Sequence, residues 1–296
     1  MGAEGTAGLW AQQVVGGIAI GCIYSLIALG FSMIVRAMDL LNFAHGEVLM
    51  LGAMLGVTAL IGLHFPYWAT ILAVTAASAA VGAALEWIVF RPLRRHRAPL
   101  DNMIIATVGL GIFLRNGAIM VWGADPVRYP VKYGEPLVLG PVRLPLENLW
   151  ILGVGVAAMV LLQLFFARTK TGVAMRASAF NPVTARLMGI PVDRMNLYTF
   201  AIGSALAGLA GVLLAPLLYA SFDMGSVGLK AFAAACLGGF GSVPGAIVGG
   251  LVLGVGETLG AFFVSTSYQD ALAFGLLILL LLFRPSGLFG RPQRAV

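Results

Sequence analysis

Three polar side chains interrupt an apolar stretch early in the sequence, and their types suit ion binding or proton transfer. Asn42, His45 and Glu47 lie between two long apolar runs. A spacing of two residues places His45 and Glu47 on different faces of a helix, so one helix cannot present both to a single metal ion. Two interpretations stay open. Either Asn42 caps a helix that carries Glu47 in its first turns, or the segment lines a pathway or gate.

Further polar residues lie inside apolar stretches, where an ionised group needs a partner or water. The sequence names no partner for Arg115 or Glu257, whereas Glu86 is expected to pair with Arg91. The candidate pathway or gating residues are therefore Asn42, His45, Glu47, Arg115, Gly238, Gly239 and Glu257.

Motifs for catalysis or nucleotide binding are absent from the sequence. Lys132, Lys170 and Lys230 are the three lysines, and none follows the glycine that a phosphate-binding P-loop requires. Neither a Gly-x-Ser-x-Gly elbow nor a His-Glu-x-x-His pair occurs. We therefore expect a protein that is not an enzyme, with no metal site and no cofactor of its own. Any energy source must be an ion gradient or another subunit.

The elements that position these residues must be membrane helices. Of the 296 residues, 60% are hydrophobic and 10% are charged, whereas soluble domains carry about 25% charged residues. A span needs roughly 20 apolar residues. The composition predicts an all-α, polytopic transmembrane bundle forming a single domain, residues 1–296. About eight spans are expected, at 9–35, 44–63, 67–90, 101–122, 150–167, 195–219, 230–264 and 268–283.

The arginines orient the spans, because short basic loops stay in the cytoplasm. Basic residues dominate 91–97, the loop 168–194 and the tail after Phe283, whereas the proline-rich loop 123–149 is nearly neutral and is predicted to lie outside. Under this assignment 230–264 must start and finish outside. The glycines and Pro244 of 238–245 therefore predict a broken or re-entrant helix pair.

Two regions, 21–56 and 203–241, resemble each other and follow spans of opposite direction. This similarity favours an inverted repeat, an arrangement in which a transport pathway lies at the repeat interface. Small residues also recur at four-residue spacing, as at Gly17 and Gly21, which predicts close helix packing.

The cytoplasmic loop 168–194 is predicted to form two short helices. The first covers 172–179, and the second starts with Asn181 as N-cap and Pro182 at the first helical position and ends at Gly189. Ala185 and Met188 are expected on one side of the second helix. Such a helix either packs on a partner or lies among lipid headgroups.

Four motifs in this order resemble the LivH-type permeases of branched-chain amino acid ABC importers. They are Asp39-Leu-Leu-Asn-Phe-Ala-His-Gly-Glu47, Arg176-Ala-Ser-Ala-Phe-Asn-Pro-Val-Thr-Ala-Arg-Leu-Met-Gly-Ile190, the stretch 228–246 with Leu237-Gly-Gly-Phe-Gly-Ser-Val-Pro-Gly245, and Arg284-Pro-Ser-Gly-Leu-Phe-Gly290. The resemblance covers about residues 10–290.

The resemblance implies an importer subunit in the bacterial inner membrane. Its partners would be a sister permease, two cytoplasmic ATP-binding subunits that hydrolyse the ATP, and a periplasmic substrate-binding protein. The loop 168–194 would couple to the ATPase, and 123–149 would be a periplasmic loop. The coupling residues would be Arg176, Ala179, Asn181, Pro182, Ala185, Arg186 and Gly189.

Two alternatives remain at this stage. Related permeases import urea or short-chain amides, so the substrate is open. A secondary transporter driven by an ion gradient could use Glu47, Glu257 and Asp270, but it gives no reason for the capped cytoplasmic helices.

Overall fold

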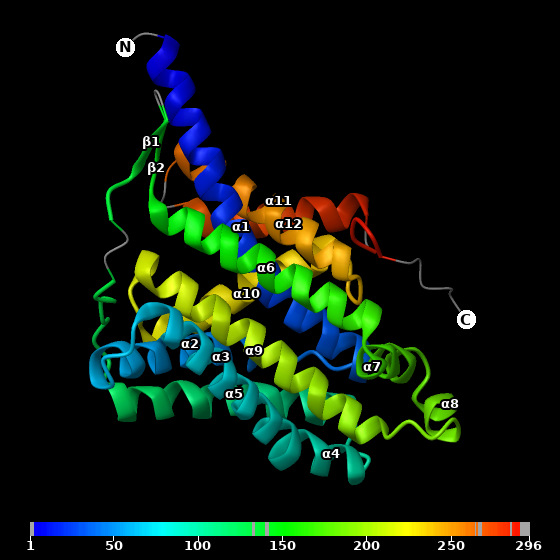
Figure 1. Cartoon of the computed structure of the whole chain (residues 1–296). Helices are drawn as coiled ribbons and strands as arrows, with labels where there is room; N and C mark the ends of the chain where they lie inside the picture. The colour runs from blue at the N-terminus through cyan, green and yellow to red at the C-terminus, as the bar shows by residue number, and fades with distance from the viewer. Residues whose placement is uncertain are drawn as a thin grey trace.

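The computed structural model describes residues 3–131, 134–139, 142–263, 265, 268–284 and 286–290. Lys132, Pro285, Arg291 and Arg294, which belong to the loops and the last motif discussed above, lie outside these ranges. In chain order the elements are α1 Ala3–Met38, α2 His45–Val57, η1 Thr58–Gly62, α3 Tyr67–Leu85, η2 Glu86–Phe90, α4 Arg91–Arg95, α5 Leu100–Trp122, β1 Leu137–Leu139, β2 Val142–Leu144, α6 Leu146–Arg168, α7 Lys170–Phe180, α8 Pro182–Leu187, α9 Val192–Leu218, η3 Phe222–Ser226, α10 Val227–Gly238, α11 Val243–Phe263 and α12 Gln269–Phe283 (Figure 1).

The fold is a polytopic helical bundle, as predicted. Seven helices of the described chain are long and apolar enough to cross a membrane. The 12-residue α10 and the 15-residue α12 are shorter, so the expected number of about eight spans stays a prediction. The predicted interruption of 230–264 is confirmed, because α10 ends at Gly238 and α11 begins at Val243.

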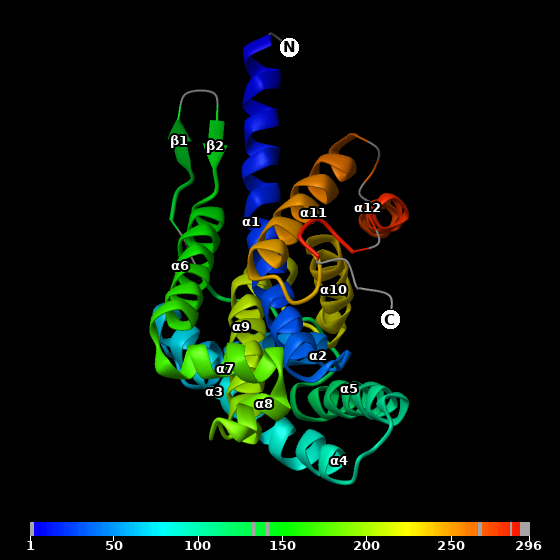
Figure 2. The same ribbon diagram turned by 90° about the vertical axis from the view of Figure 1, so that its right-hand side faces the viewer.

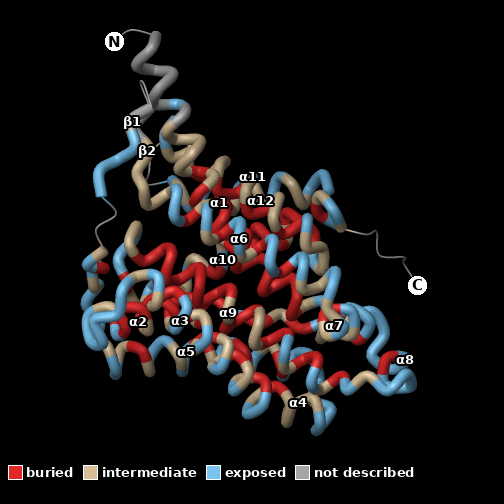
Figure 3. Tube along the Cα trace, in the orientation of Figure 1, coloured by how far each residue is buried: buried red, intermediate tan, exposed pale blue. Residues whose placement is uncertain are grey.

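Two long helices, α1 and α9, form the centre of the bundle. They pack along each other; α1 also packs along α10 and α11, and α9 packs along α2 and α3. Buried residues concentrate along this centre, whereas α4, α5 and α8 expose more of their surface (Figure 3). The reciprocal arrangement, with each central helix contacting the elements that follow the other, is what an inverted repeat would give.

Glycines bring the helix backbones together at these contacts. A Cβ atom at Gly17 would lie 2.9 Å from the Cα of Val255, and one at Gly52 would lie 2.5 Å from the Cα of Gly208. Real Cβ atoms do not approach so closely, so a larger residue would force the helices apart. The close packing predicted from the small-residue spacing is confirmed.

The predicted outside loop carries a feature that the helical pattern did not indicate. β1 and β2 form an antiparallel hairpin with Leu137 opposite Leu144, which Figure 2 shows beside the N-terminal part of α1. The start of the loop is tied to the bundle by backbone hydrogen bonds between Val127 and Ala220 at 2.8 and 2.9 Å. The buried Tyr129 donates a hydrogen bond to the Ala53 carbonyl oxygen at 2.5 Å. The loop is therefore anchored on α2 and on the segment before η3.

Candidate functional site

Two interrupted helices begin side by side inside the bundle. α2 starts at His45 and α10 starts at Val227, and their first turns meet at Gly46 and Gly228. A Cβ at Gly46 would lie 2.5 Å from the Gly225 carbonyl oxygen and 3.1 Å from the Gly228 Cα. Only glycine permits this approach. The two short helices thus converge where the two sequence repeats meet.

The start of α2 differs from the prediction. Ala44, in helical conformation, occupies the N-cap position and provides no side-chain cap. The backbone carbonyl of Asn42 accepts a hydrogen bond from the His45 amide at 3.1 Å. The Asn42 Oδ1 atom is buried and has no hydrogen-bond partner in the described chain. The prediction of Asn42 as the cap is therefore wrong, because its main chain makes the turn and the helix starts two residues too late for a side-chain cap.

His45 and Glu47 point to different surroundings, as their spacing predicts. The imidazole of His45 is fully buried against α1, with its ring centroid 4.6 Å from that of Phe31. A Cβ at Gly30 would lie 2.5 Å from the His45 Nε2 atom, so this glycine makes the space that the ring fills. His45 is a packed core residue, whereas Glu47 faces α5 and η3.

Glu47 lies in a charged cluster that joins α2, α5 and η3. Arg115 on α5 donates a hydrogen bond to the Asp223 carboxylate on η3, and its guanidinium carbon lies 5.2 Å from the Phe222 ring centroid. Gly225 packs directly against the Glu47 carboxylate. The Arg115 and Asp223 side chains are 46% and 63% exposed, so the cluster is open on one side. Asp223 is the partner that the sequence did not name for Arg115.

Glu257 also has a partner, and the pair is buried. The Lys230 Nζ atom on α10 lies 2.6 Å from the Glu257 Oε1 atom on α11 and 2.6 Å from the Asp270 Oδ1 atom on α12. The Glu257 side chain is 0% exposed, that of Lys230 15% and that of Asp270 75%. Lys230 therefore links three helices. This pairing gives Glu257 a structural role, and its role in a pathway stays a prediction.

Gly238 and Gly239 lie at the break between α10 and α11. Gly239 has φ +92°, in the left-handed region that favours glycine. The chain after α12 fills the break: the Leu288 amide donates to the Leu237 carbonyl at 2.8 Å and the Phe289 amide to the Gly238 carbonyl at 3.0 Å. The backbone groups freed by the break are thereby satisfied inside the protein, as irregular backbone at membrane depth requires.

The helix pair predicted for the loop 168–194 is present as α7 and α8. Asn181 caps α8, because its Oδ1 accepts hydrogen bonds from the amides of Val183 at 3.1 Å and Thr184 at 3.0 Å. Pro182 occupies the first turn of α8 and Gly189 has φ +80°. These local features are confirmed. α7 is longer than predicted, at Lys170–Phe180. α8 ends at Leu187, and Gly189 follows it as the predicted C-terminal glycine, with the Ile190 amide donating to the Ala185 carbonyl at 2.9 Å and the Gly189 amide to the Arg186 carbonyl at 3.0 Å.

Ala185 and Met188 do not share one side of α8, which corrects the prediction. Ala185 is 4% exposed and its carbonyl accepts a hydrogen bond from the Ile190 amide at 2.9 Å, whereas Met188 is 78% exposed. α8 ends at Leu187, so Met188 already departs from the helical spacing on which the prediction rested. Ala185 holds α8 on the bundle and does not form its outer surface.

Four large apolar side chains on α7 and α8 point into solvent. We call them the α7–α8 apolar surface: Phe180, Val183, Leu187 and Met188, which are 80%, 67%, 82% and 78% exposed. Figure 1 shows α8 projecting from the bundle. Of the four, the sequence pattern indicated only Met188, which was expected on the same side as Ala185; the predicted coupling positions were small, polar or charged. The available signal was their apolar character within a basic loop.

Arg176 and Ala179 face the opposite way. They line a cavity of about 490 Å³ between α7 and the adjoining ends of α1, α6 and α11, together with Arg36 and Gln163. Arg186 is exposed on α8. Of the predicted coupling residues, Asn181, Pro182, Ala185 and Gly189 thus shape the helix pair.

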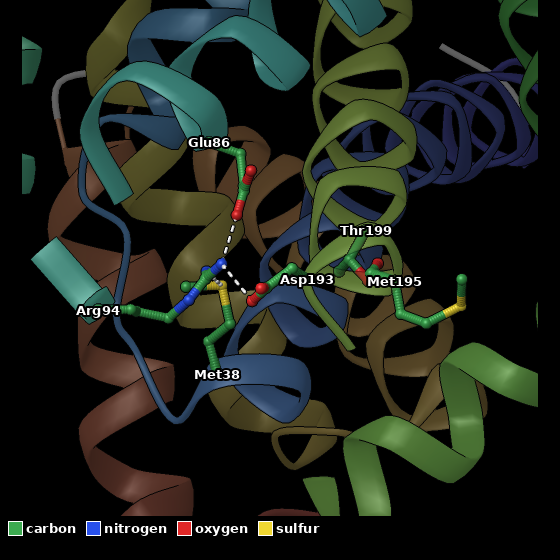
Figure 4. Close-up of polar contacts among 6 residues, drawn as sticks. All are labelled: Met38, Glu86, Arg94, Asp193, Met195 and Thr199. Atoms are coloured by element: carbon green, nitrogen blue, oxygen red, sulfur yellow. Dashed lines mark hydrogen bonds and ion pairs between the residues drawn. The ribbon is translucent and has the colours of Figure 1, made fainter. Parts of the chain in front are cut away.

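A third charged cluster links this region to the central helices. Figure 4 shows Arg94 reaching between Glu86 and Asp193, with the Met38 sulfur beside it. Arg94 lies 2.5 Å from Glu86, 3.8 Å from Asp193 and 3.2 Å from the Met38 Sδ atom. The predicted Glu86–Arg91 pair is wrong, because Arg94, two turns further on, also contacts α1 and α9. Asp193 is in the first turn of α9, only a few residues after α8.

No group of three or more His, Cys, Asp or Glu residues that could hold a metal ion occurs in the ranges that the structure describes. The three charged clusters contain ion pairs that join different helices. Their arrangement suits movement of helices relative to one another, not bond-making chemistry.

The chain resembles known transport proteins over nearly its full length. Residues 13–281 match the family model described as the branched-chain amino acid transport system / permease component. The chain is 38% identical to the high-affinity branched-chain amino acid transport system permease protein BraD of Pseudomonas aeruginosa, with 96% of this chain and 97% of that protein covered. It is 36% identical to the permease protein LivH of Salmonella typhimurium, with 95% and 96% covered.

A solved structure shares the fold. PsaBC from Streptococcus pneumoniae in complex with Fab matches with a TM-score of 0.50 and 17% identity over 98% of both chains. With the seven apolar helices, these similarities establish a multi-pass membrane protein. The chain belongs to the family of branched-chain amino acid transport system permease components.

Proposed function

We propose that this chain forms one half of the translocation pathway of an ATP-driven importer of branched-chain amino acids. It would lie in the bacterial inner membrane beside a sister permease. Two cytoplasmic ATP-binding subunits would hydrolyse the ATP, and a periplasmic binding protein would deliver the substrate. The substrate class follows the names of the relatives, which do not favour urea, short-chain amides or an ion-gradient-driven transporter.

The α7–α8 apolar surface is the observation that carries this proposal. Apolar side chains that a projecting cytoplasmic helix exposes to water are unfavourable in free energy unless a partner covers them. The caps at Thr169 and Asn181 hold both helices in a fixed shape without the partner. Because its shape is fixed before the partner binds, the α7–α8 apolar surface suits docking into a groove of an ATPase subunit.

The contacts inside the bundle give this docking a route to the pathway. Movement of α8 would pull on α9, whose first turn is held to η2 and α4 through Asp193, Arg94 and Glu86. α9 packs along α2 through Gly208 and Gly52. A rigid-body shift of α9 would thus displace α2, and interfaces of this kind switch between discrete packings.

The cluster of Glu47, Arg115 and Asp223 is proposed to lie at the pathway. It is open to one side and joins three separate elements, so relative movement of α5 and η3 would break the Arg115–Asp223 ion pair.

The loop 123–149 is proposed to meet the binding protein, because its start is anchored on α2 and on the backbone at Ala220. Contact of the binding protein with this loop would then act on α2 and η3, the elements that carry Glu47 and Asp223.

The sister permease would cover the outward side of α5. Ile105, Ile112, Phe113 and Met120 are 59–88% exposed on this helix. Arg115 lies among them in sequence. A pathway between two such faces would place the charged cluster at the centre of the pair.

The test is ligand-dependent ATP hydrolysis by the complex purified with its native partners. Binding protein loaded with leucine, isoleucine or valine is expected to stimulate hydrolysis, and complexes lacking this chain are expected to show no stimulation. Stimulation by urea or acetamide but not by leucine would refute the substrate assignment. Uptake that continues without ATP would refute the ATP-driven mechanism.

A further inference from the structure

A small basic hollow lies at the arginine-rich end of the continuous helix formed by α3, η2 and α4, beside the Glu86–Arg94 pair but without either residue in its lining. It has a volume of about 310 Å³ and is lined by Trp87, Arg91, Pro92, Arg95 and His96. Two guanidinium groups and an imidazole therefore surround one space, and the lining holds no carboxylate. Such a site favours an anion.

Arg91 lacks the partner that the sequence predicted for it. Glu86 is bound by Arg94 at 2.5 Å, and no ion pair joins Arg91 or Arg95 to a carboxylate within the described ranges. The Arg91 Nε atom is buried and has no hydrogen-bond partner there. The charge of Arg91 is therefore not neutralised by a carboxylate of the described chain, which leaves it available to an anion in the hollow.

The surroundings of the hollow indicate which anion binds. Trp87 and Ile88 are 62% and 63% exposed on the adjoining turn, and only 28% of the apolar window within Tyr67–Arg95 is buried inside the protein. This helix therefore presents an apolar side to the bilayer. Tryptophan is enriched at the level of the lipid headgroups, which places the hollow at the headgroups of the cytoplasmic leaflet.

We propose that the hollow binds the phosphate of an anionic phospholipid. The Arg91 and Arg95 guanidinium groups would donate hydrogen bonds to the phosphate oxygens. The acyl chains would lie along Trp87 and Ile88. A free phosphate would contact the same cations, but the apolar side formed by Trp87 and Ile88 would then contribute nothing to binding. Basic pockets at the cytoplasmic side of membrane proteins are known to bind lipid headgroups.

The chain offers a matched control for this proposal. Arg97 is two residues beyond Arg95, is exposed and does not line the hollow. Arg97→Gln removes the same charge as one substitution in the hollow. A double variant, Arg91→Lys with Arg95→Lys, keeps both charges but loses the bidentate geometry of arginine.

The experiment measures phosphatidylglycerol and phosphatidylcholine binding to the full chain, purified with its partners, by native mass spectrometry. Wild type is expected to bind phosphatidylglycerol at least tenfold more tightly than phosphatidylcholine. Arg91→Gln with Arg95→Gln is expected to weaken phosphatidylglycerol binding roughly 25-fold, about fivefold for each arginine. Arg97→Gln should stay within about twofold of wild type, and the double lysine variant should keep part of the preference. Unfolding temperature measured in parallel identifies variants that merely misfold.

Four results would overturn the proposal. Equal binding of the two lipids, or an equal loss in the Arg97 variant, would leave only general attraction between charges. If inorganic phosphate alone, at concentrations matching the lipid, raised the unfolding temperature as much as phosphatidylglycerol does, the hollow would be assigned to a soluble anion. Loss of the ATP-binding subunits from the double glutamine variant, with phosphatidylglycerol binding unchanged, would assign it to a protein contact.

Discussion

The ion pair between Lys230 and Glu257 should stabilise the bundle much more than the ion pair between Lys230 and Asp270. Both distances are 2.6 Å, but the Glu257 side chain is 0% exposed and that of Asp270 is 75% exposed. Lys230→Met leaves a buried carboxylate without a cation, which costs about 3–5 kcal/mol. Asp270→Asn removes an exposed partner while Lys230 keeps Glu257, so we expect a loss of about 1 kcal/mol or less.

A double variant separates the cost of the unpaired charge from the loss of packing. Lys230→Met combined with Glu257→Gln removes both charges, so most of the lost stability should return, with a coupling energy of about 2 kcal/mol or more. At roughly 2 °C per kcal/mol, Lys230→Met should lower the unfolding temperature by about 6–10 °C and Asp270→Asn by about 2 °C or less.

Thiol labelling during heating of nanodisc-embedded protein is a suitable assay. Cys22 is buried and Cys236 is partly buried, so unfolding exposes both thiols to a fluorogenic reagent. The reasoning fails if Asp270→Asn destabilises the protein as much as Lys230→Met. It also fails if the double variant loses as much stability as Lys230→Met and Glu257→Gln lose separately when their losses are added.

Three further outcomes follow from individual contacts. Asn181→Ala should cost about 1 kcal/mol of α8 stability, seen as faster amide exchange in α8 with an unchanged unfolding temperature; unchanged exchange would contradict the cap. Gly208→Val should abolish folded protein because a Cβ added at Gly208 would collide with the Ser78 side chain on α3, whereas Gly109→Val on α5, with no atoms within 4 Å of an added Cβ, should be tolerated; equal yields of monodisperse protein would refute this. Arg115→Asp should reduce uptake at least fivefold, with little change in unfolding temperature because an exposed pair contributes about 1 kcal/mol or less, and the reciprocal change Asp223→Arg should restore part of it; wild-type uptake by the single variant would exclude the ion pair from the transport cycle.

The sequence predicts the features of this protein that depend on local chemistry. Charge distribution identifies the loops and spans, glycine and proline identify the break near Gly239, and Asn181 with Pro182 identifies the start of α8. Each of these depends on backbone preferences or on the cost of charge in lipid, which act over a few residues. They can therefore be read without knowledge of the packing.

The features that the sequence did not predict depend on contacts between distant segments. Arg115 pairs with Asp223, 108 positions away, and Lys230 pairs with Glu257, 27 positions away. Glu86 pairs with Arg94 rather than with Arg91 because Arg94 also contacts Asp193 on α9. No local pattern carries this information, since it depends on how α1 and α9 cross the other helices.

The outer face of α8 was missed for a different reason. A short amphipathic helix has two possible orientations on a bundle, and the period alone does not say which face points outward. The structure buries Ala185 and exposes Leu187 and Met188. The coupling proposal therefore depends on large apolar residues rather than on the small and charged ones first selected.

Leucine uptake into proteoliposomes by the reconstituted complex tests the central proposal most directly. Leu187→Ala with Met188→Ala is compared with Val160→Ala and Leu161→Ala on α6, which are 49% and 66% exposed on a membrane helix. Full burial of a Leu or Met side chain is worth about 1.5–3 kcal/mol, so truncating both on α8 should weaken ATPase docking at least about tenfold. ATP-driven uptake should fall accordingly, while the α6 pair should transport as wild type does. Wild-type uptake and ATPase binding by the α8 pair would contradict the proposed coupling through α7 and α8.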